Sequence, residues 1–70
     1  MNVGEKLKNI RIENNLKQEQ VAAATGINRT KISKIENNKE EPNLKQLHDL
    51  IEFYGINANW LLDTGVYNNE

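Results

Sequence analysis

Cysteine is absent from the 70 residues, so neither a disulfide bond nor a thiolate metal site stabilises this chain. The sequence also has a single histidine, His48, with no second imidazole to share a metal ion. We therefore expect no bound metal and no cofactor. Seventy residues make one domain, near the size at which one apolar core is only just sufficient. Because disulfides and thiolate metal sites are absent, stability must come from packing alone.

Long apolar runs are missing as well. No stretch approaches the roughly 20 apolar residues of a membrane-spanning helix, and the residues after Met1 lack the apolar segment of a signal peptide. We expect a cytoplasmic protein with no membrane partner. The sequence contains no Ser or Cys beside a general base and no glycine-rich phosphate loop, so we predict no catalytic residue and no enzymatic activity.

Charge is unevenly distributed along the chain. The net charge of −1 argues against a nucleic-acid-binding protein, which usually has a basic surface. Residues 1–39, however, hold eight Lys or Arg and four acids, a sum of +4, whereas residues 40–70 hold one Lys and six acids, a sum of −5. If the first half carries a nucleic-acid-binding face, we expect the acidic half to lie away from it and to weaken nonspecific attachment.

Apolar residues recur at helical spacing along most of the chain, which predicts an all-α fold of five helices. Helix-ending signals follow at Asn14-Asn15, Gly26, Asn37-Asn38 and Gly55. The expected helices cover about 3–14, 18–25, 28–37, 44–54 and 57–63. The fourth has the clearest core-facing stripe, made of Leu44, Leu47, Leu50, Ile51 and Tyr54. We expect Trp60 and Leu61 to pack back onto the core.

Residues 18–35 predict a helix-turn-helix. Ala22 is small enough for a second helix to pass close by, and Gly26 supplies the left-handed backbone of a sharp helix exit. On a helical wheel of the second helix, Ile32 and Ile35 define the inward side. The outward side then carries hydroxyls, an amide and long cations, which suit base edges and phosphate oxygens in a major groove. These outward residues are Arg29, Thr30, Ser33, Lys34 and Asn37.

The ordered set of residues in and around this motif resembles the Cro and phage-repressor type of helix-turn-helix family, also called XRE-like. The set comprises Arg11, Gln18, Ala22, Gly26, Ile32, Ile35, Glu36, Pro42, Leu44, Leu47 and the run Trp60, Leu61, Leu62. The resemblance covers about residues 4–65. It implies a compact, five-helix, lambda-repressor-like DNA-binding domain over residues 1–65, followed by a flexible tail at 66–70.

The resemblance also implies which residues contact DNA. Carried over residue by residue, base-edge contacts fall on Asn28, Arg29, Thr30, Ser33 and Lys34. Phosphate contacts fall on Lys17, Gln18, Asn37 and Lys39. In similar repressors, residues matching Arg11 and Glu36 form an ion pair between the first and third helices. Many relatives carry glutamine where this chain has Arg29, so the preferred DNA sequence does not transfer.

By the same resemblance we expect a sequence-specific regulator of transcription, a repressor, whose helix 28–37 enters the major groove of double-stranded DNA. Such a domain reads one half-site, so we expect a homodimer, at least on DNA, over a pseudo-palindromic operator. Dimer contacts are expected at Phe53, Trp60, Leu62 and Tyr67. The family often has a small residue in place of Phe53, whose ring either extends the core, which we favour, or leaves an apolar patch for another subunit.

Two alternatives to this function stay open. The first is an antitoxin-like regulator that binds its operator and also binds a protein partner, with Phe53 and the tail forming the protein interface. The second is a protein-interaction module that does not bind DNA, which the overall acidity permits. The salt dependence of DNA binding distinguishes them, because groove binding releases counterions and weakens steeply as salt increases.

Overall fold

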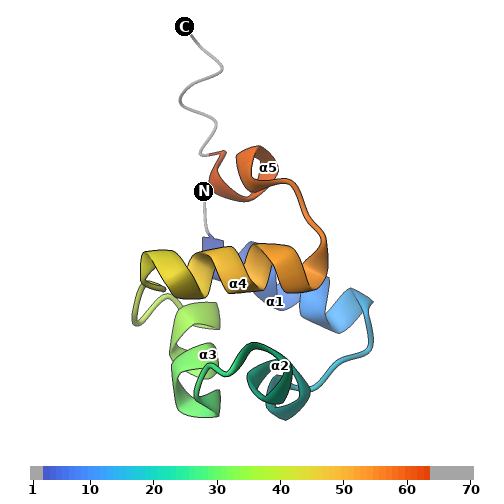
Figure 1. Cartoon of the computed structure of the whole chain (residues 1–70), viewed down its shortest axis with the longest axis vertical. Coiled ribbons are helices and arrows are strands. Elements are labelled where there is room, and N and C mark those ends of the chain that lie inside the picture. The colour runs from blue at the N-terminus through green and yellow to red at the C-terminus, as the bar shows by residue number, and fades with distance from the viewer. Residues whose placement is uncertain (1–2, 64–70) are drawn as a thin grey trace, which may run out of the picture.

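The computed structural model describes residues 3–63, which form five α-helices and no strand. The helices are α1 (Val3–Glu13), α2 (Gln18–Thr25), α3 (Arg29–Glu36), α4 (Leu44–Tyr54) and α5 (Ala58–Leu62). This confirms the predicted all-α fold. Figure 1 shows α1 and α4 across the middle of the molecule, with α2 and α3 on one side of them and α5 on the other. The expected tail at 66–70 lies outside the described residues.

Local capping signals determine where the helices begin. Asn43 caps α4 through a reciprocal pair of hydrogen bonds with Gln46, in which Asn43 Oδ1 accepts from the Gln46 backbone N–H (2.7 Å) and Gln46 Oε1 accepts from the Asn43 N–H (3.0 Å). Asn57 caps α5 by accepting from the backbone N–H groups of Asn59 and Trp60. Each cap satisfies donors that the first helical turn leaves unpaired.

Left-handed backbone conformations end the helices at the predicted positions. Gly26, after α2, has a φ of 76°, and Gly55, after α4, has a φ of 65°. Two asparagines adopt the same conformation, Asn15 with a φ of 59° and Asn38 with a φ of 60°. Asparagine tolerates this region better than most residues other than glycine. The left-handed backbone of Gly26 thus turns the chain sharply between α2 and α3.

Every helix contributes to one apolar core. The buried apolar side chains are Leu7 of α1, Val21 of α2, Ile27 of the turn, Ile32 and Ile35 of α3, Leu50 of α4 and Leu61 of α5. Burying one such side chain contributes about 1.5–3 kcal/mol to folding. Because Ile32 and Ile35 both face this core, the rotation of α3 about its own axis is determined by packing.

Three predicted core residues lie at the surface instead. Leu44 is 83% exposed, because it is the first residue of α4 and its side chain points back past the helix start, beyond the reach of the other helices. Trp60 is 44% exposed, since Leu61 takes the core position of the short helix α5. Phe53 is 37% exposed and packs edge-on against the neighbouring Tyr54 ring, at a centroid distance of 5.0 Å. The expectation that Phe53 extends the core is therefore wrong.

Gly4 brings α1 unusually close to the end of α3. A Cβ atom at this position would overlap the backbone carbonyl oxygen of Ile35 and lie 2.7 Å from the Asn38 side chain. Only glycine fits this approach without a shift of backbone.

Within residues 3–63, none of the helices is both long and apolar enough to cross a lipid bilayer.

Candidate nucleic-acid interface

The outer face of α3 is the candidate interface, and Asn28 sets its first turn. The Asn28 side-chain oxygen accepts from the backbone N–H groups of Thr30 (2.7 Å) and Lys31 (3.4 Å). Asn28 is therefore the N-cap of α3. The cap uses only the side-chain oxygen of Asn28, so the side-chain amide N–H groups are not consumed by it. A residue expected to contact a base is thus also the residue that starts the helix.

Polar side chains predicted to contact bases lie together on this face. Arg29, Thr30 and Lys34 are exposed, Ser33 is half-buried, and Ile32, Ile35 and Glu36 face inward. Within residues 3–63 the side chains of Arg29 and Thr30 make no hydrogen bond or ion pair. The guanidinium of Arg29 therefore has all of its donors available, in the planar arrangement that matches guanine O6 and N7.

An ion pair between Arg11 and Glu36 joins α1 to α3. Arg11 Nε donates to Glu36 Oε2 at 2.8 Å, and Arg11 Nη2 donates to Glu36 Oε1 at 3.1 Å. Arg11 Nη1 also donates to the carbonyl of Leu16 in the turn before α2. The Glu36 carboxylate, chiefly by its hydrogen bond, raises the pKa of Arg11, while burial acts in the opposite direction. One guanidinium thus connects α1, the following turn and α3.

Gln18 extends this network instead of facing outward. Its side-chain amide donates to Glu36 Oε1 at 3.1 Å and is half-buried. The predicted phosphate contact at this position is thereby reduced to the remaining amide N–H and to the backbone N–H groups of the first turn of α2. Gln18 instead fixes the start of α2 against α3. The sequence alone did not indicate this contact, which spans 18 residues of chain.

Tyr54 lies near the same network from the side of α4. Burial of its side chain, and secondarily the charge of Glu36, raise the pKa of Tyr54 to about 12, whereas the charge of Arg11 lowers it. The phenol therefore remains neutral at physiological pH. The hydrogen bonds around the buried Glu36 carboxylate therefore join α1, α2 and α3, and Tyr54 of α4 is affected by the charges of this network.

The other predicted phosphate contacts lie at the edges of the candidate interface. Lys17, just before α2, and Lys39, just after α3, are exposed, and their side chains make no hydrogen bond or ion pair within the described residues. Asn37 is also exposed, but its amide folds back and donates to the carbonyl oxygen of Ser33 at 2.9 Å. Two cations are thus available beside α2 and α3, and one amide is partly engaged.

Glu40 is a residue of this region that the sequence patterns did not single out. Its carboxylate accepts from Lys31 Nζ at 2.9 Å and lies 3.3 Å from Lys34 Nζ. The hydrogen bonds from Lys31 and Lys34 lower the pKa of Glu40. The expectation that acids beyond residue 39 lie away from α3 is therefore wrong for Glu40. No periodic spacing connects it to Lys31 and Lys34, because the intervening loop determines the contact.

Three of the residues predicted for dimerisation, Phe53, Trp60 and Leu62, are described by the structure, and they do not form one surface. Phe53 lines a groove between α2 and α4 together with Ala24, Thr25, Lys45, Asp49 and Glu52. Trp60 and Leu62 lie on α5, on the other side of α1 and α4 from α2 and α3 (Figure 1). Lys6 Nζ lies 5.0 Å from the centre of the Trp60 ring and donates to the carbonyl of Trp60 at 2.6 Å. Tyr67 lies outside the described residues.

Comparison with known proteins identifies the motif. A family model described as "Helix-turn-helix domain" matches residues 4–65. The HTH-type transcriptional activator BcrR of Enterococcus faecalis is 39% identical over 62 residues, which cover 89% of this chain and 30% of that protein. The chain thus spans about a third of the length of this relative.

A solved structure shares the fold. A chain of the complex of SinR protein and SinI protein superposes with a TM-score of 0.82 at 22% sequence identity, covering 94% of this chain and 65% of that chain. At this level of identity the similarity concerns the arrangement of the helices. This superposition agrees with the five-helix architecture of the described residues (Figure 1).

Proposed function

The chain belongs to the helix-turn-helix domain family of DNA-binding transcription regulators, and from this premise we propose that it recognises a specific double-stranded DNA sequence through the outer face of α3. The observation that carries the proposal is the state of Arg29 and Thr30, whose side chains are exposed and have no partner within residues 3–63. The buried ion pair of Arg11 with Glu36 supports it by holding α3 at a defined rotation.

In the proposed complex, Arg29, Thr30 and Lys34 read base edges, assisted by Asn28 and Ser33. An eight-residue helix is about 12 Å long, which matches three or four base pairs. Lys17 and Lys39 contact phosphates on either side of the groove, with smaller contributions from Asn37 and the start of α2 at Gln18. Phosphate contacts position the domain, whereas base contacts select the sequence.

We further propose that two copies bind a pseudo-palindromic operator, because one α3 reads only one half-site. Half-sites separated by about 34 Å, one helical turn of DNA, fit a two-fold dimer. The exposed Trp60 and Leu62 on α5 support contact between copies on the side away from α3. Binding over a promoter is enough to block polymerase, so we propose repression, although the relative BcrR is named an activator. Increased output of a promoter reporter would contradict repression.

The decisive experiment has two steps. The first selects bound sequences from random duplex DNA, which reports sequence preference and half-site spacing. The second compares Arg29→Ala with Lys39→Ala on the selected duplex and on random duplex. Arg29→Ala should weaken the binding free energy for the selected duplex by about 1–3 kcal/mol, and that for random DNA by much less, because it removes a base contact. Lys39→Ala should weaken both equally.

An equal loss for the two duplexes in Arg29→Ala would exclude direct base readout by this residue.

A second candidate function, binding of a protein partner through α5, is favoured by the exposed Trp60 and Leu62. Salt separates the two functions. DNA affinity should fall linearly with the logarithm of salt concentration, with a slope of about −0.9 for each phosphate neutralised. A module that binds only protein shows no such slope with any duplex.

A further inference from the structure

The loop that follows α3 folds back onto the last turn of the helix. The backbone N–H groups of Lys39 and Glu40 both donate to the carbonyl oxygen of Lys34, at 2.8 and 3.3 Å. The backbone of Glu40 is thus attached to the same residue whose side chain its carboxylate approaches. This attachment keeps an acidic side chain beside a helix face that carries Arg29 and Lys34.

The carboxylate of Glu40 bridges two lysines of α3. One oxygen accepts from Lys31 Nζ at 2.9 Å and the other lies 3.3 Å from Lys34 Nζ. Lys31 also donates to the backbone carbonyl of Glu41 at 3.0 Å, and its side chain is only 25% exposed. Lys31 therefore holds the loop, whereas Lys34, with 48% of its side chain exposed, remains accessible from the outer face.

We propose that Glu40 competes with DNA phosphate for the ammonium group of Lys34, and so weakens attachment to nonspecific DNA more than binding to the preferred sequence. This inference rests on the proposed DNA-binding function. A carboxylate and a phosphate oxygen accept from the same ammonium donors, so a lysine that stays paired with Glu40 releases no counterion from DNA.

The two kinds of complex differ in what Lys34 gains. On random DNA, Lys34 gains at most a phosphate, which replaces the Glu40 carboxylate without net advantage. On the preferred sequence, Lys34 gains a base-edge acceptor while Arg29 and Thr30 bind neighbouring bases, so the exchange is favourable. Glu40 thereby increases the ratio of specific to nonspecific affinity without touching a base.

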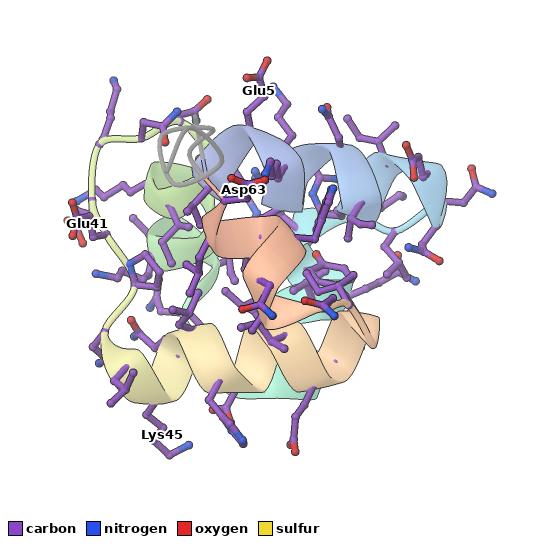
Figure 2. The ribbon with its side chains drawn as sticks, turned by 90° about the horizontal axis from the view of Figure 1, so that it is seen from above. Glu5, Glu41, Lys45 and Asp63 are labelled. Atoms are coloured by element: carbon purple, nitrogen blue, oxygen red, sulfur yellow. The ribbon has the colours of Figure 1, made fainter. Side chains whose placement is uncertain are left out.

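The test removes the Glu40 carboxylate and uses the next residue as a matched control. Glu40→Gln removes the charge, and Glu40→Ser also removes the reach to both lysines. Glu41→Gln removes one unit of charge from the same loop and retains the backbone carbonyl that Lys31 contacts. Glu41 is exposed at the edge of the molecule (Figure 2). Its carboxylate makes no ion pair within the described residues. Thermal melting first establishes that each variant is folded.

Fluorescence anisotropy with a labelled pool of random duplexes of about 20 base pairs, enough for two half-sites, measures nonspecific affinity. The titrations cover about 50 to about 200 mM KCl. Glu40→Gln and Glu40→Ser should bind about two- to fivefold more tightly than the wild type, the size expected for an exposed ion pair. Their salt slope should become steeper by about 0.9, since one more phosphate is neutralised. Glu41→Gln should keep the wild-type slope.

The outcomes separate this inference from the proposed function. If the wild type binds DNA with a steep salt slope and both Glu40 variants match either the wild type or Glu41→Gln, the competition is absent and only this inference fails. If the wild type binds no duplex, the proposed function fails with it. On the selected duplex, Glu40→Gln should gain less affinity than on random DNA, and an equal gain overturns the proposed effect on specificity.

Discussion

The carboxylate of Glu36 is the residue-scale feature on which the position of α3 depends. It is 5% exposed, and Arg11 and Gln18 both donate to it. A buried ion pair contributes little net stability, because desolvation offsets the attraction, but loss of one partner leaves an unpaired charge. We therefore assign the network mainly to orientation of α3 relative to α1 and α2.

Glu36→Ala should lower the free energy of unfolding by about 3 kcal/mol, because Arg11 is left largely buried without its partner. Urea denaturation followed by circular dichroism measures this change. The exposed Glu13 of α1 offers a matched control, and Glu13→Ala should stay within about 0.5 kcal/mol of the wild type. Equal stability of the two variants would show that the network does not stabilise the fold.

At the scale of the elements, α1 and the end of α3 meet at Gly4, where a side chain would overlap the Ile35 carbonyl oxygen. Sequence periodicity places Gly4 in α1 but does not reveal this approach, since a glycine in a helix usually only lowers helix stability. The close approach is set by the positions of α1 and α3 in the folded chain. It also explains why a glycine is suited to the first turn of α1.

Gly4→Ala tests that contact. In an exposed helix this change stabilises by about 1 kcal/mol, but here the added methyl group should destabilise the domain by about 1–3 kcal/mol, as expected for overpacking. Thermal and urea unfolding give the sign directly. Asn9→Ala, at an exposed position of the same helix, should be neutral or stabilising. A stabilised Gly4→Ala protein would mean that α1 moves away from α3 at little cost.

At the scale of the whole molecule, α3 and α5 lie on different sides of the layer formed by α1 and α4 (Figure 1). The polar outer face of α3 and the exposed apolar side chains of α5 are therefore separate surfaces. A domain built in this way can bind a duplex with one surface and another protein chain with the other. The proposed dimer uses both surfaces at once.

Leu62→Ser tests the assignment of α5 to dimer contact. Leu62 is 42% exposed, so its replacement should alter unfolding by less than about 0.5 kcal/mol. Binding to a duplex with two selected half-sites should lose cooperativity, whereas binding to one half-site should not change. Leu44→Ser makes the same substitution at a leucine that is 83% exposed on α4 and should affect neither measurement. Identical effects of the two substitutions would argue against α5 as the contact.

Short-range chemistry in the sequence by itself determined the helices and their ends. Asn28, Asn43 and Asn57 cap helices because an asparagine side chain bonds backbone groups two or three residues away, and Gly26 and Gly55 end helices because their own backbone permits a positive φ. The 3.6-residue period likewise identified the inward side of α3. These interactions act within about one turn of helix, so they could be inferred without the fold.

Only the tertiary structure decided the contacts between residues distant in the chain. The amide of Gln18 turns toward Glu36, Glu40 bridges two lysines of α3, and Lys6 lies beside Trp60, which is 54 positions further along the chain. Leu44 continues the apolar stripe of α4 but extends beyond the neighbouring helices. The reason is geometric. The helical period defines the direction in which a side chain leaves the axis of its helix, whereas the residue that this side chain contacts depends on where the other helices lie and end.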